Sequence, residues 1–194
     1  MDGSIVPLSQ DRPPRDSNLY RDYEEVIRSF RSLYENHSRR IVGVVKDSRS
    51  RRLMEILKDR IPMEVMTDSL DTNLLIHALR KGEATPSFPL TDEAKKHPVY
   101  RDLLPYSEKM VFSYVRAGAY DRPLRLEFMD GWDPRPSILF LSSINESYSY
   151  PSILIEVDLR AQIDPKYVER VRRRIMMSGL TDSLPLRRTS RPFR

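Results

Sequence analysis

The chain has 194 residues, about the length of one ordinary domain. It carries 33 basic and 28 acidic residues, a formal net charge of +5, and 39% hydrophobic residues, so we expect a globular fold rather than a disordered chain. The absence of cysteine excludes disulfides, cysteine-ligated zinc and cysteine nucleophiles. No apolar run reaches the ~18–20 residues of a membrane span and no signal peptide is evident, which predicts a cytoplasmic protein.

The positive charge is concentrated near the C-terminus. Residues 165–194 hold nine arginines or lysines against two acidic residues, a local charge of +7, which leaves −2 on the preceding 164 residues. A basic segment beside a near-neutral body is typical of a protein that contacts a polyanion such as nucleic acid. The alternative explanation is a solvated helix face that continues into a basic tail.

The first part of the chain predicts two helices around a buried strand. Apolar residues recur every three or four positions over 19–34, which indicates a helix with one buried face. The run RIVGVVK at 40–46 is rich in β-branched residues and predicts a buried strand, in which Gly43 allows close packing. A polar turn at 47–50 then leads into a helix over 51–60.

The middle of the chain predicts a helix and an antiparallel meander. We expect a short strand at 63–66, and Asp71 is expected to cap a helix over 72–81 that Gly82 ends. A loop rich in proline and charged residues fills 83–107. Three strand-like runs, separated by turn signals, predict the meander: Met110–Val115, Leu124–Met129 and Ser137–Leu141.

The last part of the chain predicts two helices, over about 150–162 and 164–178. Helices before, between and after the strands predict an α/β domain whose sheet is covered at least partly on both faces. We expect a single domain over 1–179, followed by a basic tail over 180–194.

Most catalytic motifs are missing from the sequence. There is no Gly-x-Ser-x-Gly motif, the six glycines form no phosphate-binding loop, and His37, His77 and His97 share no metal-binding spacing. Carboxylates remain. Phosphodiester hydrolysis with Mg²⁺ or Mn²⁺ requires several Asp or Glu side chains that converge on the metal, because these hard cations prefer oxygen ligands.

Five aspartates are candidates for such a site: Asp2, Asp47, Asp71, Asp130 and Asp158. Asp71 is better explained as a helix cap, and Asp130, before Gly131, as a turn residue. Asp158 lies in the apolar segment SILIEVDLRAQI, so we expect it to be at least partly buried. A buried carboxylate there is either a metal ligand or the partner of Arg160 or another arginine.

The turn KDSRS at 46–50 places a cation, a carboxylate, hydroxyls and a guanidinium directly after the predicted buried strand. This combination suits a phosphate backbone. A solvated turn in which Asp47 or Ser48 caps the next helix is an equally simple explanation. The candidate nucleic-acid contacts are basic residues of this turn, of the helix after it and of the last helix: Lys46, Arg49, Arg51, Arg172 and Arg173.

Three sequence blocks stand in a distinctive order and spacing: DGSIVP at 2–7, IVGVVKDSRS at 41–50 and YPSILIEVDLRA at 150–161. Together they resemble the second half of the NurA family of DNA-end-processing nucleases, and the segment 71–88 is also similar to that family. The resemblance covers essentially the whole chain. It implies an RNase H-like, Piwi-like α/β fold, in which a mixed sheet flanked by helices carries an acidic site.

The resemblance also implies an activity, a metal and partners. It implies Mn²⁺-dependent cleavage of DNA, with Mg²⁺ as the alternative, by a single-strand endonuclease and 5′-to-3′ exonuclease that acts in end resection and recombinational repair. It implies a homodimer that works with a hexameric HerA-type ATPase. By position, Asp2 and Asp158 match the family's metal site and Tyr150 matches its Y-P tyrosine, so these three residues are the candidate catalytic residues. The turn at 46–50 matches a turn beside that site.

Other family members carry an upstream segment with an aspartate and a glutamate that have no counterpart here. With only Asp2 and Asp158, a two-metal site is incomplete. We therefore predict a sheet truncated at its N-terminal edge, in a nuclease by ancestry that is weakly active or inactive as this chain. The alternative is a non-catalytic module that binds DNA or a motor ATPase. A third interpretation is an unrelated α/β domain with an accidental resemblance.

Overall fold

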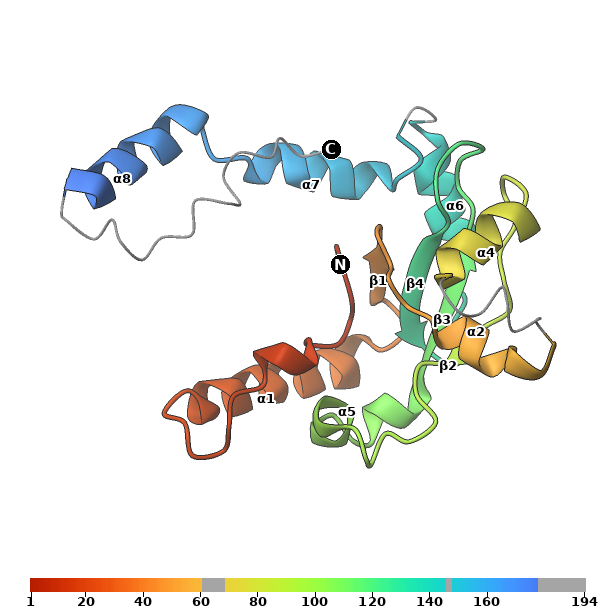
Figure 1. Ribbon diagram of the computed structural model, residues 1–194, viewed down its shortest axis with the longest axis horizontal. Helices are drawn as coiled ribbons and strands as arrows, with labels where there is room; N and C mark the ends of the chain where they lie inside the picture. The colour runs from red at the N-terminus through yellow and green to blue at the C-terminus, as the bar shows by residue number, and fades with distance from the viewer. Residues whose placement is uncertain (61–68, 146–147, 178–194) are drawn as a thin grey trace. The chain divides into compact units, whose positions relative to one another are not determined.

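The computed structural model (Figure 1) describes three stretches of the chain: residues 1–60, 69–145 and 148–177. The chain divides into two compact units, Met1–Ile155 and Glu156–Arg194. The first unit contains the sheet and its covering helices. The second contains the end of α7 (Ser152–Ala161) and all of α8 (Pro165–Met177). The short strand expected at 63–66 lies outside the described residues.

The named strands form one antiparallel sheet in the order β1-β4-β3-β2. Its strands are β1 (Val42–Val45), β2 (Phe88–Pro89), β3 (Met110–Val115) and β4 (Leu124–Met129). The predicted strands at 40–46, Met110–Val115 and Leu124–Met129 are thereby confirmed, and β3 and β4 pair as predicted. Asp2 adds an isolated parallel bridge to Val44, so the pairing around β1 is mixed.

The predicted third strand of the meander is wrong. Ser137–Leu141 lies inside a helix, α6 (Arg135–Ser143). Pro136 stands in the first turn of this helix, where the missing N–H of proline costs nothing and its fixed φ suits the helix. Ile138 and Ser142, four residues apart, are the buried residues of α6, which is helical rather than strand periodicity.

The helices of the first unit precede, interrupt and follow the strands. Besides α6 they are α1 (Tyr20–His37), α2 (Arg52–Ile56), α4 (Asp71–Ala78) and α5 (Pro98–Asp102), with 3-10 turns at Ser9–Asp11, Lys58–Arg60 and Tyr106–Lys109. The expected helices over 19–34, 51–60 and 72–81 are present, and α2 and α4 are shorter than predicted. The stretch 83–107, predicted as a loop, contains β2 and α5. No helix within the three described stretches has the length and apolar character to cross a membrane.

Both faces of the sheet are covered, as predicted. One face packs against residues of α1, α2, α4 and α5, in a cluster that includes Tyr34, Phe112 and Tyr114. The other face packs against α6 and the start of α7, in a cluster that includes Leu126 and Tyr150. Every residue of β4 is therefore buried, including the charged ones.

Candidate functional site

Asp2 lies at the end of the N-terminal segment, where that segment meets β1. The Gly3 amide donates to the Val44 carbonyl at 2.9 Å and the Val44 amide donates to the Met1 carbonyl at 3.0 Å, which forms the parallel bridge. Gly3 has φ +93°, a left-handed conformation that suits glycine. The backbone turns directly after Asp2, and the Asp2 side chain is exposed.

Tyr150 lies next to Asp2, although the two residues are 148 positions apart. Its hydroxyl donates a hydrogen bond of 2.6 Å to Asp2 Oδ1. The Tyr150 side chain is only 2% exposed and packs in the cluster on the α6 face of the sheet, so its ring is held firmly. The structure thus brings together two of the three residues predicted to be catalytic.

Lys46 joins this group from the end of β1. Its Nζ donates to the Tyr148 hydroxyl at 2.6 Å and lies 4.2 Å from the centre of the Tyr148 ring and 5.1 Å from that of Tyr150. Such contacts hold an ammonium group beside the faces of aromatic rings. The Lys46 side chain is exposed, so a cation stands near the Asp2 carboxylate at the protein surface.

Tyr148 was not among the residues predicted from the sequence. It is 48% exposed and meets Tyr150 edge to face, with ring centroids 6.3 Å apart. The signal was available in the pattern Tyr148-Ser149-Tyr150. Ser149 has φ +47°, and a residue in this left-handed conformation lets the chain turn sharply between the two tyrosines. The candidate site is therefore Asp2, Lys46, Tyr148 and Tyr150.

The KDSRS turn at 46–50 is stabilised by hydrogen bonds of its two serine side chains. The Ser48 side chain is 6% exposed, and its Oγ lies 3.4 Å from the Tyr114 hydroxyl. The Ser50 amide donates to Ser48 Oγ at 3.3 Å, and the Arg52 amide donates to Ser50 Oγ at 3.0 Å. Ser50, rather than the expected Asp47 or Ser48, receives the amide at the start of α2.

Ser48, which is buried, and Ser50, which is half-buried, stabilise this turn, and its charged residues lie at the surface. The side chains of Lys46, Asp47, Arg49 and Arg51 are exposed, and we call these four residues the charged edge. This exposure is what the predicted phosphate contacts require.

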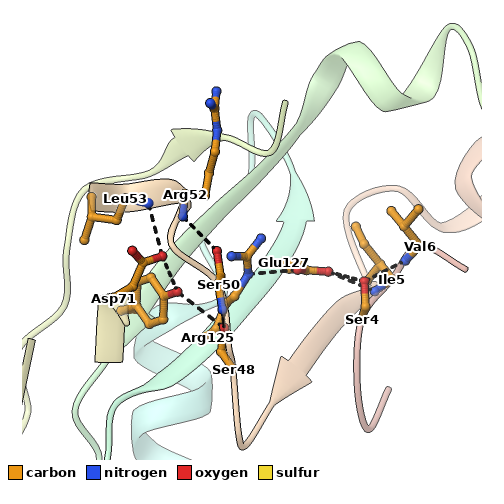
Figure 2. Close-up of polar contacts among 11 residues, drawn as sticks. Ser4, Ile5, Val6, Ser48, Ser50, Arg52, Leu53, Asp71, Arg125 and Glu127 are labelled. Atoms are coloured by element: carbon orange, nitrogen blue, oxygen red, sulfur yellow. Dashed lines mark hydrogen bonds and ion pairs between the residues drawn. The ribbon is translucent and has the colours of Figure 1, made fainter. Parts of the chain in front are cut away.

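Asp71 caps a different helix from the one expected. Its carboxylate is fully buried and accepts the amide of Leu53 at 3.1 Å (Figure 2). It also accepts the amide of Met54 at 3.0 Å, so it satisfies the first turn of α2. The Tyr114 hydroxyl donates to Asp71 Oδ2 at 2.9 Å, and burial raises the pKa of Tyr114, which keeps this donor protonated. The prediction that Asp71 caps its own helix is wrong. The side chain satisfies α2 instead and takes no part in the candidate site.

Asp158 is not buried, contrary to the prediction. It lies on α7 as an exposed side chain, and its apolar neighbours Val157 and Leu159 are 54% and 58% exposed. Arg160, the expected ion-pair partner, instead pairs with Glu156 at 2.7 Å. The apolar composition of the segment indicated a covered helix, but its residues 157–159 are not covered by the described part of the chain. Asp158 belongs to the second unit, whereas Asp2 belongs to the first.

The remaining predicted residues are exposed, on a helix surface or in a turn. Arg172 and Arg173, on α8, both approach Glu169, at 3.9 and 3.3 Å, and their side chains are 45% and 75% exposed. Asp130 is exposed and precedes Gly131, which has φ +86°, so it lies in the expected turn after β4.

Two buried charged residues of β4 were missed. Arg125 Nε donates to Glu127 Oε1 at 2.9 Å, and the side chains are 8% and 6% exposed. The Arg125 guanidinium also lies 4.5 Å from the centre of the Phe112 ring. Charged and apolar residues alternate in LRLEFM, yet all six residues of β4 are buried, because both faces of the sheet are covered.

The chemistry of Asp2 fits a divalent cation as one ligand of a larger set. Its carboxylate is exposed, and Tyr150 is its hydrogen-bond partner at one oxygen, Oδ1, which leaves a second carboxylate oxygen for a hard cation. Within residues 1–60, 69–145 and 148–177, no group of three or more His, Cys, Asp or Glu side chains could hold a metal ion.

Two comparisons with known proteins gave matches. The family model described as the NurA domain matches residues 1–163. The crystal structure of the NurA nuclease from Sulfolobus solfataricus is similar to this chain, with 18% sequence identity and a TM-score of 0.57, over 95% of this chain and 61% of that one. The chain thus spans less than two thirds of that structure. The likeness confirms the predicted RNase H-like α/β fold. A search of curated proteins gave no significant match.

Proposed function

This chain belongs to the NurA family, and on that premise we propose that it is a divalent-metal-dependent nuclease that acts on DNA. One observation carries the proposal. The 2.6 Å hydrogen bond from Tyr150 to Asp2 brings the first and last of the three sequence blocks into one place. The middle block contributes Lys46 to the same place. The exposed Asp2 carboxylate and the exposed Lys46 ammonium group thus both lie beside Tyr150, whose ring is buried.

In this proposal the acids hold the metal and the basic residues hold the DNA. Asp2 and Asp158 would bind Mn²⁺, or Mg²⁺, because both cations prefer carboxylate oxygens. When bound, the ion activates water and stabilises the charge that develops on phosphate oxygens. Tyr150 fixes the orientation of Asp2 through its hydroxyl.

The DNA contacts come from exposed side chains. Lys46 and Arg49, with Arg51 beside them, would bind the phosphate backbone next to Asp2, because their charges lie at the surface. Arg172 and Arg173 of α8 are proposed as further phosphate contacts, since their side chains are also exposed. The family resemblance adds the polarity, as a single-strand endonuclease and 5′-to-3′ exonuclease.

Partners form the second part of the proposal. Large apolar side chains of the second unit are exposed in the described stretches: Val157, Leu159, Ile163, Tyr167 and Val168. An apolar surface of this kind supports association with another protein, and we propose a second copy of the chain as the partner. The family resemblance adds a HerA-type hexameric ATPase, and with it a cytoplasmic role in DNA end resection and recombinational repair.

A non-catalytic module that binds DNA or an ATPase is the second candidate function. The observation that favours it is that the described residues contain no cluster of three or more acidic or histidine side chains able to hold a metal ion. Sites for two metals usually hold three or four carboxylates. In this alternative the charged edge binds DNA and the chain alone does not cut it.

A cleavage assay separates the two candidates. The purified chain is incubated with end-labelled single-stranded DNA and Mn²⁺, with and without EDTA, beside the Asp2→Asn and Asp158→Ala variants. Asp130→Asn is the matched control, because it removes an exposed carboxylate of a surface turn. Cleavage that needs metal and is lost in both site variants but not in the control supports the nuclease. DNA binding without cleavage supports the module.

A further inference from the structure

A buried carboxylate on β4 reaches the segment that carries Asp2. Glu127 is 5% exposed. Its Oε2 accepts the Ser4 hydroxyl at 2.5 Å and the Ile5 amide at 3.2 Å (Figure 2). Ser4 Oγ in turn accepts the Val6 amide at 3.1 Å. One side chain of the central sheet therefore binds a tight turn that begins two residues after Asp2.

A gain in folding stability does not by itself explain why a glutamate is buried at position 127. A buried ion pair such as Arg125–Glu127 loses most of its attraction to desolvation, and an apolar pair of similar volume is often as stable. An apolar side chain would, however, leave Ser4 and the Ile5 amide without their acceptor. The specific contribution of Glu127 is therefore Oε2, the oxygen that faces the N-terminal segment.

The neighbouring strand is shaped to allow this contact. Gly43 of β1 pairs directly with Glu127, so the two residues share one face of the sheet. A Cβ atom added at Gly43 would lie 2.6 Å from the Gly3 carbonyl oxygen and 2.9 Å from the Ile5 nitrogen. Only glycine leaves room there for the N-terminal segment. Glu127 reaches Ser4 and Ile5 across the space that the missing side chain opens.

We propose that Glu127 is a positioning residue for Asp2. Three contacts fix the backbone around Asp2: the bridge to Val44, the Glu127 carboxylate on Ser4 and Ile5, and the Tyr34 hydroxyl donating to the Ile5 carbonyl. A metal ligand works only when its geometry is held closely, and groups that orient ligands change metal affinity by about 10–100-fold. The inference rests on the proposed function, in which Asp2 binds the metal.

The test measures metal binding rather than cleavage. The full chain is titrated with Mn²⁺, and free Mn²⁺ is followed by its EPR signal. The variants are Asp2→Asn, Glu127→Gln and Ser4→Ala. Ser4→Ala removes one of the two donors and leaves the buried ion pair intact, so it covers the case in which Glu127→Gln does not fold. Asp71→Asn is the control, because Asp71 is equally buried but has no contact with the N-terminal segment.

We expect Glu127→Gln to weaken Mn²⁺ binding about tenfold and Ser4→Ala to weaken it by a smaller factor, with Asp71→Asn binding as the wild type does. If folded Glu127→Gln and Ser4→Ala bind Mn²⁺ like the wild type while Asp2→Asn does not, the positioning role is overturned and the metal role of Asp2 stands. If Asp2→Asn binds like the wild type, the metal site itself is overturned. Equal weakening in Asp71→Asn would attribute the effect to lost stability.

Discussion

Asp71 and Asp2 lie in two regions of the first unit, and their carboxylates differ in burial and in the number of hydrogen-bond donors that they receive. Asp71 is fully buried and receives three donors, two amides of α2 and the Tyr114 hydroxyl. Asp2 is exposed and receives the Tyr150 hydroxyl on one oxygen. A carboxylate whose lone pairs are taken by the protein contributes to folding, whereas one that keeps an accessible oxygen can bind a cation.

Both carboxylates accept a hydrogen bond from a tyrosine hydroxyl, but the bond has a different consequence at each. Each hydroxyl donates to one carboxylate oxygen, at 2.9 Å for Tyr114 and 2.6 Å for Tyr150. Around Asp71 the tyrosine completes a set of donors. Around Asp2 it orients the side chain and leaves the rest of the carboxylate open. The number of donors on the carboxylate distinguishes Asp71, which has a structural role, from Asp2, the proposed metal ligand.

The largest expected effect is the loss of activity in Asp2→Asn. If Asp2 holds the metal, this variant should lose at least about a hundredfold in cleavage rate, because metal stabilisation of the phosphate charge is worth several kcal/mol. Its free energy of unfolding should change by less than about 0.5 kcal/mol, because the side chain is exposed. Cleavage kinetics and urea denaturation measure the two quantities. Unchanged cleavage would remove Asp2 from the site.

Asp71→Ala should show the opposite behaviour. It leaves the Leu53 and Met54 amides and the Tyr114 hydroxyl without an acceptor in the protein interior. We expect a loss of about 3 kcal/mol in the free energy of unfolding, since each buried unsatisfied donor costs about 1–3 kcal/mol and the costs are not additive. Urea denaturation measures it. A loss below about 1 kcal/mol would show that water reaches these donors and that the two regions are alike.

The fold could be predicted where periodicity is long or repeated. The helical spacing of apolar residues in α1 and the runs of β3 and β4 identified these elements correctly. The run SILFL of α6 is too short for its periodicity to separate strand from helix. The decisive signal was Pro136, whose fixed φ favours the first turn of a helix.

The candidate site could be predicted only through the resemblance. No spacing rule connects Asp2 with Tyr150 across 148 positions, and the three sequence blocks carried that pairing. Local rules misassigned Asp71, because capping rules consider the helix next in sequence, whereas this carboxylate caps the one before it. Glu127 was missed because alternation reports which residues share a face and not whether that face is covered.

Replacing Tyr150 or Tyr114 by phenylalanine tests the comparison of the two carboxylates by removing only the hydroxyl that each one accepts. The expected effects are smaller than those of the aspartate variants. Tyr150→Phe should lower the cleavage rate about tenfold, the equivalent of one lost hydrogen bond of about 1.4 kcal/mol, because Asp2 loses its orientation. Tyr114→Phe should cost about 1 kcal/mol of stability and leave the cleavage rate unchanged. Cleavage kinetics and urea denaturation of both variants test this. A Tyr150→Phe variant that loses only stability would place Tyr150 in the same class as Tyr114.

Asp102 gives an intermediate case, and its effect is the smallest. Its Oδ2 accepts Arg12 Nε at 2.8 Å and the Tyr23 hydroxyl at 3.1 Å, so both partners are side chains. Burial and this hydrogen bond raise the pKa of Tyr23 to about 12 from an ordinary value of 10. A raised tyrosine pKa means that the folded state keeps its proton longer, so this contribution is present below pH 10 and is lost as the pH rises through about 12.

Tyr23→Phe should therefore cost about 1 kcal/mol near neutral pH, and the cost should shrink as the pH rises above 10. Chemical denaturation of the wild type and the variant at pH 8 and pH 11 measures the difference, in which the titration of other groups cancels. Tyr120→Phe serves as the control, because the Tyr120 side chain is fully exposed and its hydroxyl has no burial to lose. A cost that stays constant between the two pH values would mean that Tyr23 titrates alike in the folded and unfolded states. The hydrogen bond from Tyr23 to Asp102 would then lack the protection from solvent that the buried Asp71 site provides.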